Sequence, residues 1–102
     1  MGYIAPDIIR AKSEKLLGGA YEFNETAVEL ALEGKVDEAR GLWEKAVADD
    51  PYFVSAYLNL GIYWANRGER KKAAGYLDKV MSLDPDHQKA KNLLTDLGET
   101  PH

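Results

Sequence analysis

The stretch YLNLGIYWANRGERKKAAGYLDKVMSLDP, residues 57–85, decides the fold of this chain. Its first half places four apolar or small residues on one helical stripe, at i, i+3, i+4 and i+7: Tyr57, Leu60, Gly61 and Trp64. Gly68 then predicts a helix stop. A second stripe follows the stop: Ala73, Leu77, Val80 and Met81. We expect Asp84-Pro85 to end this second helix and to begin another, because proline cannot continue a helix but suits its first turn.

The same plan occurs 34 residues earlier in the chain. The positions that recur at this offset are Gly34, Ala39, Gly41, Lys45, Asp50 and Pro51, which return as Gly68, Ala73, Gly75, Lys79, Asp84 and Pro85. A fixed period in this range marks a solenoid of stacked units rather than a globule with a catalytic cleft. The sequence therefore predicts an all-α fold, an α-solenoid of antiparallel helix pairs.

The two copies resemble the tetratricopeptide repeat (TPR) family, whose unit has large, small and aromatic residues, alanines and a proline at set positions. The second copy fits that pattern closely through Tyr57, Leu60, Gly61, Trp64, Ala73, Leu77, Val80 and Pro85. The first copy fits it through Phe23, Ala27, Leu30, Ala39, Trp43, Ala46 and Pro51. Thr26 stands where the family usually has a leucine, so the first copy is less typical. The large residues of these stripes, Trp43, Tyr57 and Trp64, are interpreted as core rather than as a stacking platform.

The resemblance implies five segments. They are an N-terminal helical extension at 1–19, repeats at 20–53 and 54–87, a capping helix at 88–98 and a tail at 99–102. Gly18-Gly19 should separate the extension from a helix that begins near Ala20. The extension either packs on the first repeat or forms a movable arm, which lies in the groove or exchanges with a second copy.

In TPR proteins the first helix of each repeat lines a concave groove, and this implies a ligand site here position by position. The groove residues are Tyr21, Asn24, Val28, Leu32, Ser55, Leu58, Asn59, Ile62, Asn66 and Lys89. Leu58 and Ile62 have no evident use in the repeat core, so we expect an apolar floor with polar edges. Either a partner's apolar side or helix occupies this floor, or neighbouring helices or the N-terminal segment cover it.

The family's best-known activity grips the carboxylate-ended tail of a chaperone with Lys, Asn, Asn, Lys and Arg. Asn59 and Lys89 match two of those positions, whereas Asn24, Val28 and Leu93 occupy the others. Because most of the clamp's cations are absent, chaperone-tail binding is not expected.

No set of residues for catalysis, a metal or a cofactor is evident in the sequence. The chain has no cysteine. Its histidines, His87 and His102, lack partners at metal-ligand spacing, and Asp84 and Asp86 near His87 suit helix termination better. Gly18-Gly19 lacks the lysine of a phosphate loop. We therefore predict no enzymatic activity, no metal and no cofactor.

Charge and hydropathy limit the classes of partner that the chain is expected to bind. The formal charge of -4 argues against general affinity for nucleic acid or anionic membranes. No apolar run is long enough to insert in a bilayer, and the first residues do not resemble a signal peptide. The cytoplasm is the default location, although a soluble domain of a larger or membrane-anchored protein would look the same. The basic cluster Arg67, Arg70, Lys71 and Lys72 is interpreted as a solvated face, or alternatively as a rim contact for an acidic partner or RNA.

These features predict a non-catalytic protein–protein interaction module that binds an apolar peptide or helix in its groove. The alternative is structural, either self-assembly into a homodimer or oligomer or a scaffold unit within a larger complex.

Overall fold

The computed structural model describes residues 19–98 of the chain. Its helices are α2 (Ala20–Leu32), α3 (Val36–Asp49), α4 (Val54–Asn66), α5 (Arg70–Leu83) and α6 (Gln88–Asp96), and this described part contains no strand. The predicted all-α class is confirmed. The helical extension predicted before Gly19 and the tail at 99–102 lie outside the described residues. The chain divides between Pro51 and Tyr52 into two compact units.

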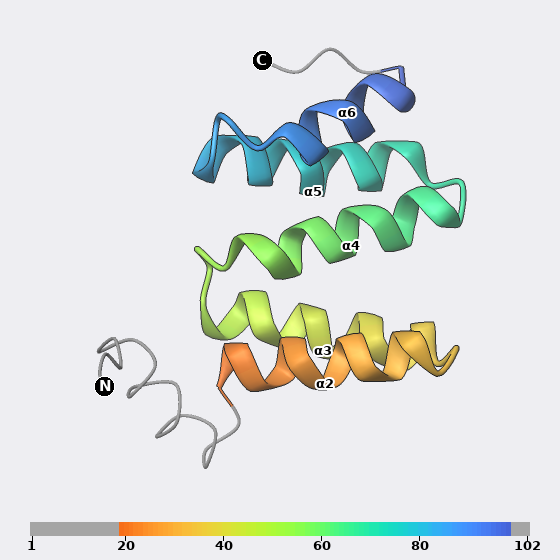
Figure 1. The fold of residues 1–102 in the computed structure, drawn as a ribbon, viewed down its shortest axis with the longest axis vertical. Helices are drawn as coiled ribbons and strands as arrows, with labels where there is room; N and C mark the ends of the chain where they lie inside the picture. The colour runs from red at the N-terminus through yellow and green to blue at the C-terminus, as the bar shows by residue number, and fades with distance from the viewer. Residues whose placement is uncertain (1–18, 99–102) are drawn as a thin grey trace. The chain divides into compact units, whose positions relative to one another are not determined.

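The first unit is a helix pair in which α2 packs antiparallel against α3 (Figure 1). Trp43 is the largest buried apolar side chain described in this unit, since it is only 6% exposed and the other buried apolar residues there are all alanines. These alanines are Ala20, Ala27, Ala39 and Ala46. Small residues let the two helices approach closely, and the indole fills the space that remains. The prediction that Trp43 belongs to the core is confirmed.

The second unit adds a third helix, since α4 packs on α5 and α5 packs on α6 (Figure 1). Its largest fully buried side chains are Leu60, Leu77, Val80 and Leu94. The predicted capping helix is present, and its buried residues, Ala90 and Leu94, join the core cluster formed with α5. Leu58 and Tyr57 of α4 pack against that cluster as partly buried side chains. The expectation that Leu58 has no use in the core is therefore wrong.

Glycine ends α2 and α4 where the sequence predicted a stop. Gly34 has a φ of 86° and Gly68 a φ of 78°, in the left-handed region that glycine adopts without steric cost. The Lys35 N–H donates to the Leu30 carbonyl at 2.8 Å, and the Gly34 N–H donates to the Ala31 carbonyl at 3.0 Å. The same pair of bonds follows Asn66. Both ends are Schellman motifs, which use carbonyls that the helix leaves unpaired.

The two prolines lie before the helices that they were predicted to begin. Pro51 and Pro85 lie in turns after the C-caps Asp50 and Asp84, not in the first turn of the next helix. In the second turn the Asp86 N–H donates to Asp84 Oδ1 at 3.3 Å. This side-chain bond holds the turn in place of a helical hydrogen bond, so α6 begins only at Gln88.

The start of α2 is held by a tertiary contact that the sequence did not reveal. Gly19 precedes the helix and provides no side-chain cap. Instead, the Ala20 N–H donates to Asp49 Oδ2 at 2.8 Å, and Asp49 is the last residue of α3. An anionic group at a helix N-terminus also interacts favourably with the helix dipole. This bond ties the beginning of the helix pair to its end.

His87 caps α6 through its imidazole ring. The Ala90 N–H donates to His87 Nδ1 at 3.2 Å, whereas α2 to α5 have no side-chain cap. We expect His87→Ala to lower the free energy of unfolding by about 1 kcal/mol, because one helical N–H loses its acceptor. His87→Asn, a preferred capping residue, should keep or raise it. Urea denaturation followed by circular dichroism measures both, and an unchanged His87→Ala variant would contradict the capping role.

Candidate protein-binding surfaces

One face of α2 exposes a row of large apolar side chains. Tyr21 is 48% exposed, Val28 37% and Leu32 83%, and their spacing places them along one side of the helix. We call these three residues the α2 row. Asn24, which was expected to orient a ligand from the edge of this surface, is only 7% exposed and is not free of interactions. Its burial sets it apart from the exposed α2 row.

The other predicted groove residues belong to the second unit. On α4, Ser55 and Asn66 are exposed, and Leu58, Asn59 and Ile62 are half-buried. Lys89 is exposed near the start of α6. Leu58 is partly used by the core, as described above, which leaves Ile62 as the large apolar side chain of this set without that packing role. The two sets of predicted residues thus lie in separate units.

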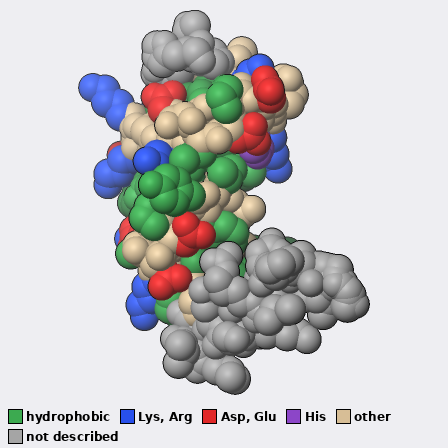
Figure 2. Space-filling view, turned by 90° about the vertical axis from the view of Figure 1, so that its left-hand side faces the viewer, with side chains coloured by type: hydrophobic (Ala, Val, Ile, Leu, Met, Phe, Trp, Pro, Cys, Tyr) green, Lys and Arg blue, Asp and Glu red, His purple; other side chains and the backbone are tan. Residues whose placement is uncertain are grey.

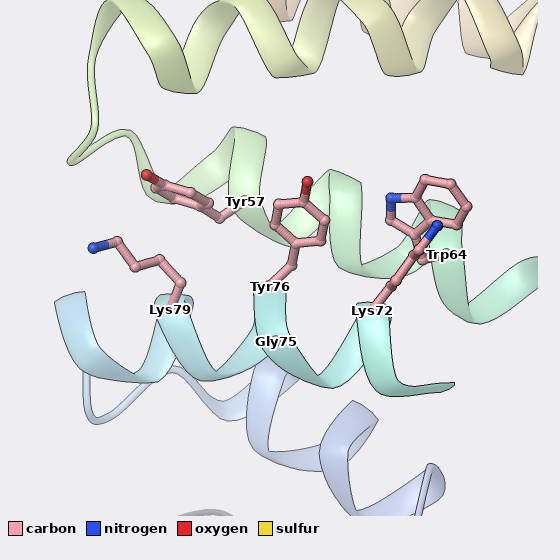
Figure 3. A pocket seen from close by; sticks show the side chains of 6 residues that line it. All are labelled: Tyr57, Trp64, Lys72, Gly75, Tyr76 and Lys79. Atoms are coloured by element: carbon pink, nitrogen blue, oxygen red, sulfur yellow. The ribbon is translucent and has the colours of Figure 1, made fainter. Parts of the chain in front are cut away.

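The second unit also carries an open hollow of about 440 Å³ between α4 and α5 (Figure 3). We call it the aromatic hollow; its lining residues are Tyr57, Trp64, Lys72, Gly75, Tyr76 and Lys79. Tyr57 and Trp64 were predicted to be core; each is half-buried, Tyr57 packs against the core cluster, and both rings also line this hollow. The core interpretation therefore does not account for the exposed part of either ring.

The rings and lysines of the aromatic hollow contact one another. The Tyr57 and Tyr76 ring centroids lie 6.5 Å apart with a tilt of 36°. Lys72 Nζ lies 4.1 Å from the centroid of the Trp64 ring, and Lys79 Nζ lies 5.8 Å from that of Tyr57. Each lysine therefore makes a cation–π contact at one end of the hollow (Figure 3). The arrangement offers aromatic faces in the middle and positive charge at both ends.

A signal for this hollow exists in the sequence, in the differences between the two copies. At the offset of 34 residues, Tyr57, Trp64 and Tyr76 correspond to Phe23, Leu30 and Leu42, and Lys72 corresponds to Glu38. The positions that pack helices together stay small in both copies, as Ala39 and Ala73 show. The positions identical in both copies define the repeat period, and these differing positions are not among them.

Other kinds of site are not evident in the described residues. No three His, Asp or Glu side chains between residues 19 and 98 gather in a way that could hold a metal ion. No helix in this range is long and apolar enough to cross a membrane. Figure 2 shows acidic, basic and hydrophobic side chains of the described residues interspersed on one face.

Comparison with known proteins identifies the repeats. The family model for the tetratricopeptide repeat matches residues 30–97, which include most of the described helices. A peroxisomal targeting signal receptor from Kluyveromyces lactis is 36% identical over 56 residues, which are 55% of this chain and 10% of the receptor. The chain thus spans about a tenth of the length of that relative. The repeated helix pairs, their glycine stops and the family match together show that this chain belongs to the tetratricopeptide repeat family.

Proposed function

We propose that this chain is a non-catalytic module that binds an apolar peptide or helix of a partner protein on the first helices of its repeats. TPR repeats generally mediate protein–protein interaction. The observation that carries the proposal is the α2 row, three large apolar side chains exposed to water along one helix. The named relative is a receptor for a targeting signal, which agrees with a binding role for such repeats.

The α2 row can supply the binding energy. Burying a fully exposed leucine or valine side chain contributes about 1.5–3 kcal/mol. Leu32, at 83% exposure, has most of that contribution still to gain from a partner. In the second unit, taken by itself, half-buried Ile62 of α4 offers an apolar contact, and the polar groups predicted around it are Ser55, Asn59, Asn66 and Lys89. Binding driven in this way should have a negative heat-capacity change and little dependence on salt.

Val28→Lys with Leu32→Lys should weaken peptide binding by at least about tenfold, since two apolar contacts are lost and two charges would be buried. The ligand is a peptide selected from a random library on the full chain, and calorimetry measures its affinity. The matched control is Val36→Lys, because Val36 is also exposed and apolar (41%) but lies on α3. Circular dichroism verifies folding. Unchanged affinity in the double variant would show that the α2 row is not the site.

The α2 row also fits the structural alternative, in which copies of the chain associate through it. Light scattering over a hundredfold dilution separates the two functions. A monomer at every concentration leaves the row free for a partner. If the unaltered chain is a dimer and the variant with Val28→Lys and Leu32→Lys is a monomer, the α2 row instead serves self-assembly.

A further inference from the structure

The helix pair that forms the aromatic hollow differs in charge from the rest of the chain. Residues 54–83 carry 5 basic and 2 acidic side chains, within a chain whose formal charge is -4. Residues 20–49, at the same positions of the preceding copy, carry 3 basic and 8 acidic side chains. The α4–α5 pair is therefore a local electropositive surface, which attracts anionic partners.

The start of α5 strengthens this field. Its first turn contains Arg70, Lys71 and Lys72 and no acid, whereas the first turn of α3 contains Asp37 and Glu38. A helix N-terminus is already electropositive, so cations there are unfavourable unless an anion joins them. The acid next to this basic run is the N-cap residue Glu69, so the first turn of α5 itself remains positively charged.

Among residues 19–98, the two lysines of the aromatic hollow have no acidic partner. Lys72 and Lys79 are exposed and form no ion pair within residues 19–98; their contacts there are with the Trp64 and Tyr57 rings. Lys79 is seven positions after Lys72, so the two lie about 10.5 Å apart along one side of α5, about two helical turns. Gly75 lies between them, and a Cβ added there meets nothing within 4 Å. The absence of a side chain keeps the middle of the hollow open.

We propose that the aromatic hollow is a second binding site, which takes an extended acidic segment of a partner protein with an aromatic or apolar side chain between two carboxylates. In an extended strand, residues i, i+2 and i+4 share one face, and the outer two lie about 13 Å apart. Two carboxylates at that spacing reach Lys72 and Lys79, and the side chain between them packs on Tyr57, Trp64 and Tyr76. Charge complementarity selects the segment, and ring contact adds affinity.

A blocked Glu-Gly-Phe-Gly-Glu pentapeptide is the probe, with NMR of the indole N–H signals of the full chain as the measurement. We expect the Trp64 signal to shift on titration and the Trp43 signal, from the first unit, to stay in place. Lys72→Glu should weaken binding by at least about fivefold, because one attraction becomes a repulsion. Lys45→Glu is the matched control, because Lys45 is the exposed counterpart of Lys79 on α3.

Two further variants separate shape from charge. Gly75→Leu fills the hollow without changing charge, and should also weaken binding, with circular dichroism showing an intact fold. A Lys-Gly-Phe-Gly-Lys peptide should bind the variant with Lys72→Glu and Lys79→Glu better than it binds the unaltered chain. The proposal is overturned if the Trp64 signal does not respond, or if Lys72→Glu and Lys45→Glu change the affinity equally.

The site is independent of the α2 row. The variant with Val28→Lys and Leu32→Lys should bind the pentapeptide with unchanged affinity. A failure of one proposal can therefore be told apart from a failure of the other. If light scattering finds an oligomer that Lys72→Glu dissociates, the hollow holds a second copy of the chain, and the assignment to a partner's segment is wrong.

Discussion

Trp43→Ala should lower the free energy of unfolding by about 3–5 kcal/mol, the largest effect expected of a single substitution in this chain. The indole is 6% exposed, and the buried apolar neighbours described in its unit are alanines, which cannot expand into the space it would leave. Such a loss approaches the whole stability of a small domain, which is about 5–15 kcal/mol. Much of the variant population should therefore be unfolded at physiological temperature.

Urea denaturation followed by far-ultraviolet circular dichroism measures this loss. Trp64→Ala is the matched control, since it removes the same side chain from a half-buried position at the aromatic hollow. Its cost should be clearly smaller, because less area returns to water and no closed cavity forms. Equal costs for the two variants would mean that Trp43 does not hold the first unit together.

Gly61→Ala should lower the free energy of unfolding by about 1–3 kcal/mol, even though alanine is the better helix former. A Cβ at this position would lie 2.8 Å from both Cγ and Cδ2 of Leu77. Leu77 is fully buried in the core of the second unit, so it cannot move aside without displacing its neighbours. The glycine is therefore required by the close approach of α4 to α5.

Gly75→Ala provides the control for Gly61→Ala, because both glycines lie inside helices of the same unit. A Cβ at Gly75 meets nothing within 4 Å, so only the gain in helix propensity remains. We expect this variant to be more stable than the original by about 0.5–1 kcal/mol. Thermal denaturation of the pair should show shifts of opposite sign, and a stabilised Gly61→Ala variant would contradict the packing argument.

The helices and their ends could be predicted because their causes are local. Apolar stripes at helical spacing gave the helix pairs of residues 20–83, and Gly34 and Gly68 gave the stops, since only glycine adopts the left-handed conformation there without cost. The repeat period also identified the family, because the positions that pack the helices together recur in both copies. The position of Pro85 in a turn was not predicted, because the turn is closed by a hydrogen bond in which Asp84 Oδ1 accepts from the Asp86 N–H.

The candidate surfaces could be predicted only in part. The α2 row follows from the helical pattern, and Tyr21, Val28 and Leu32 are exposed as that pattern implied. Asn24 and Leu58 share the same arc, yet one is buried and the other packs on the core cluster. A helical wheel gives the direction of a side chain but not how far the neighbouring helix reaches.

The sequence by itself determined the helix pairs, their glycine stops and the family, because these depend on spacing along the chain. Only the tertiary structure decided which members of each stripe are buried. Trp43 and Trp64 both belong to apolar stripes, but α2 and α3 close around the first, whereas α4 and α5 leave the second at an open hollow beside Lys72. Burial depends on how two helices approach, and that distance is fixed by contacts such as Gly61 against Leu77, between residues far apart in sequence.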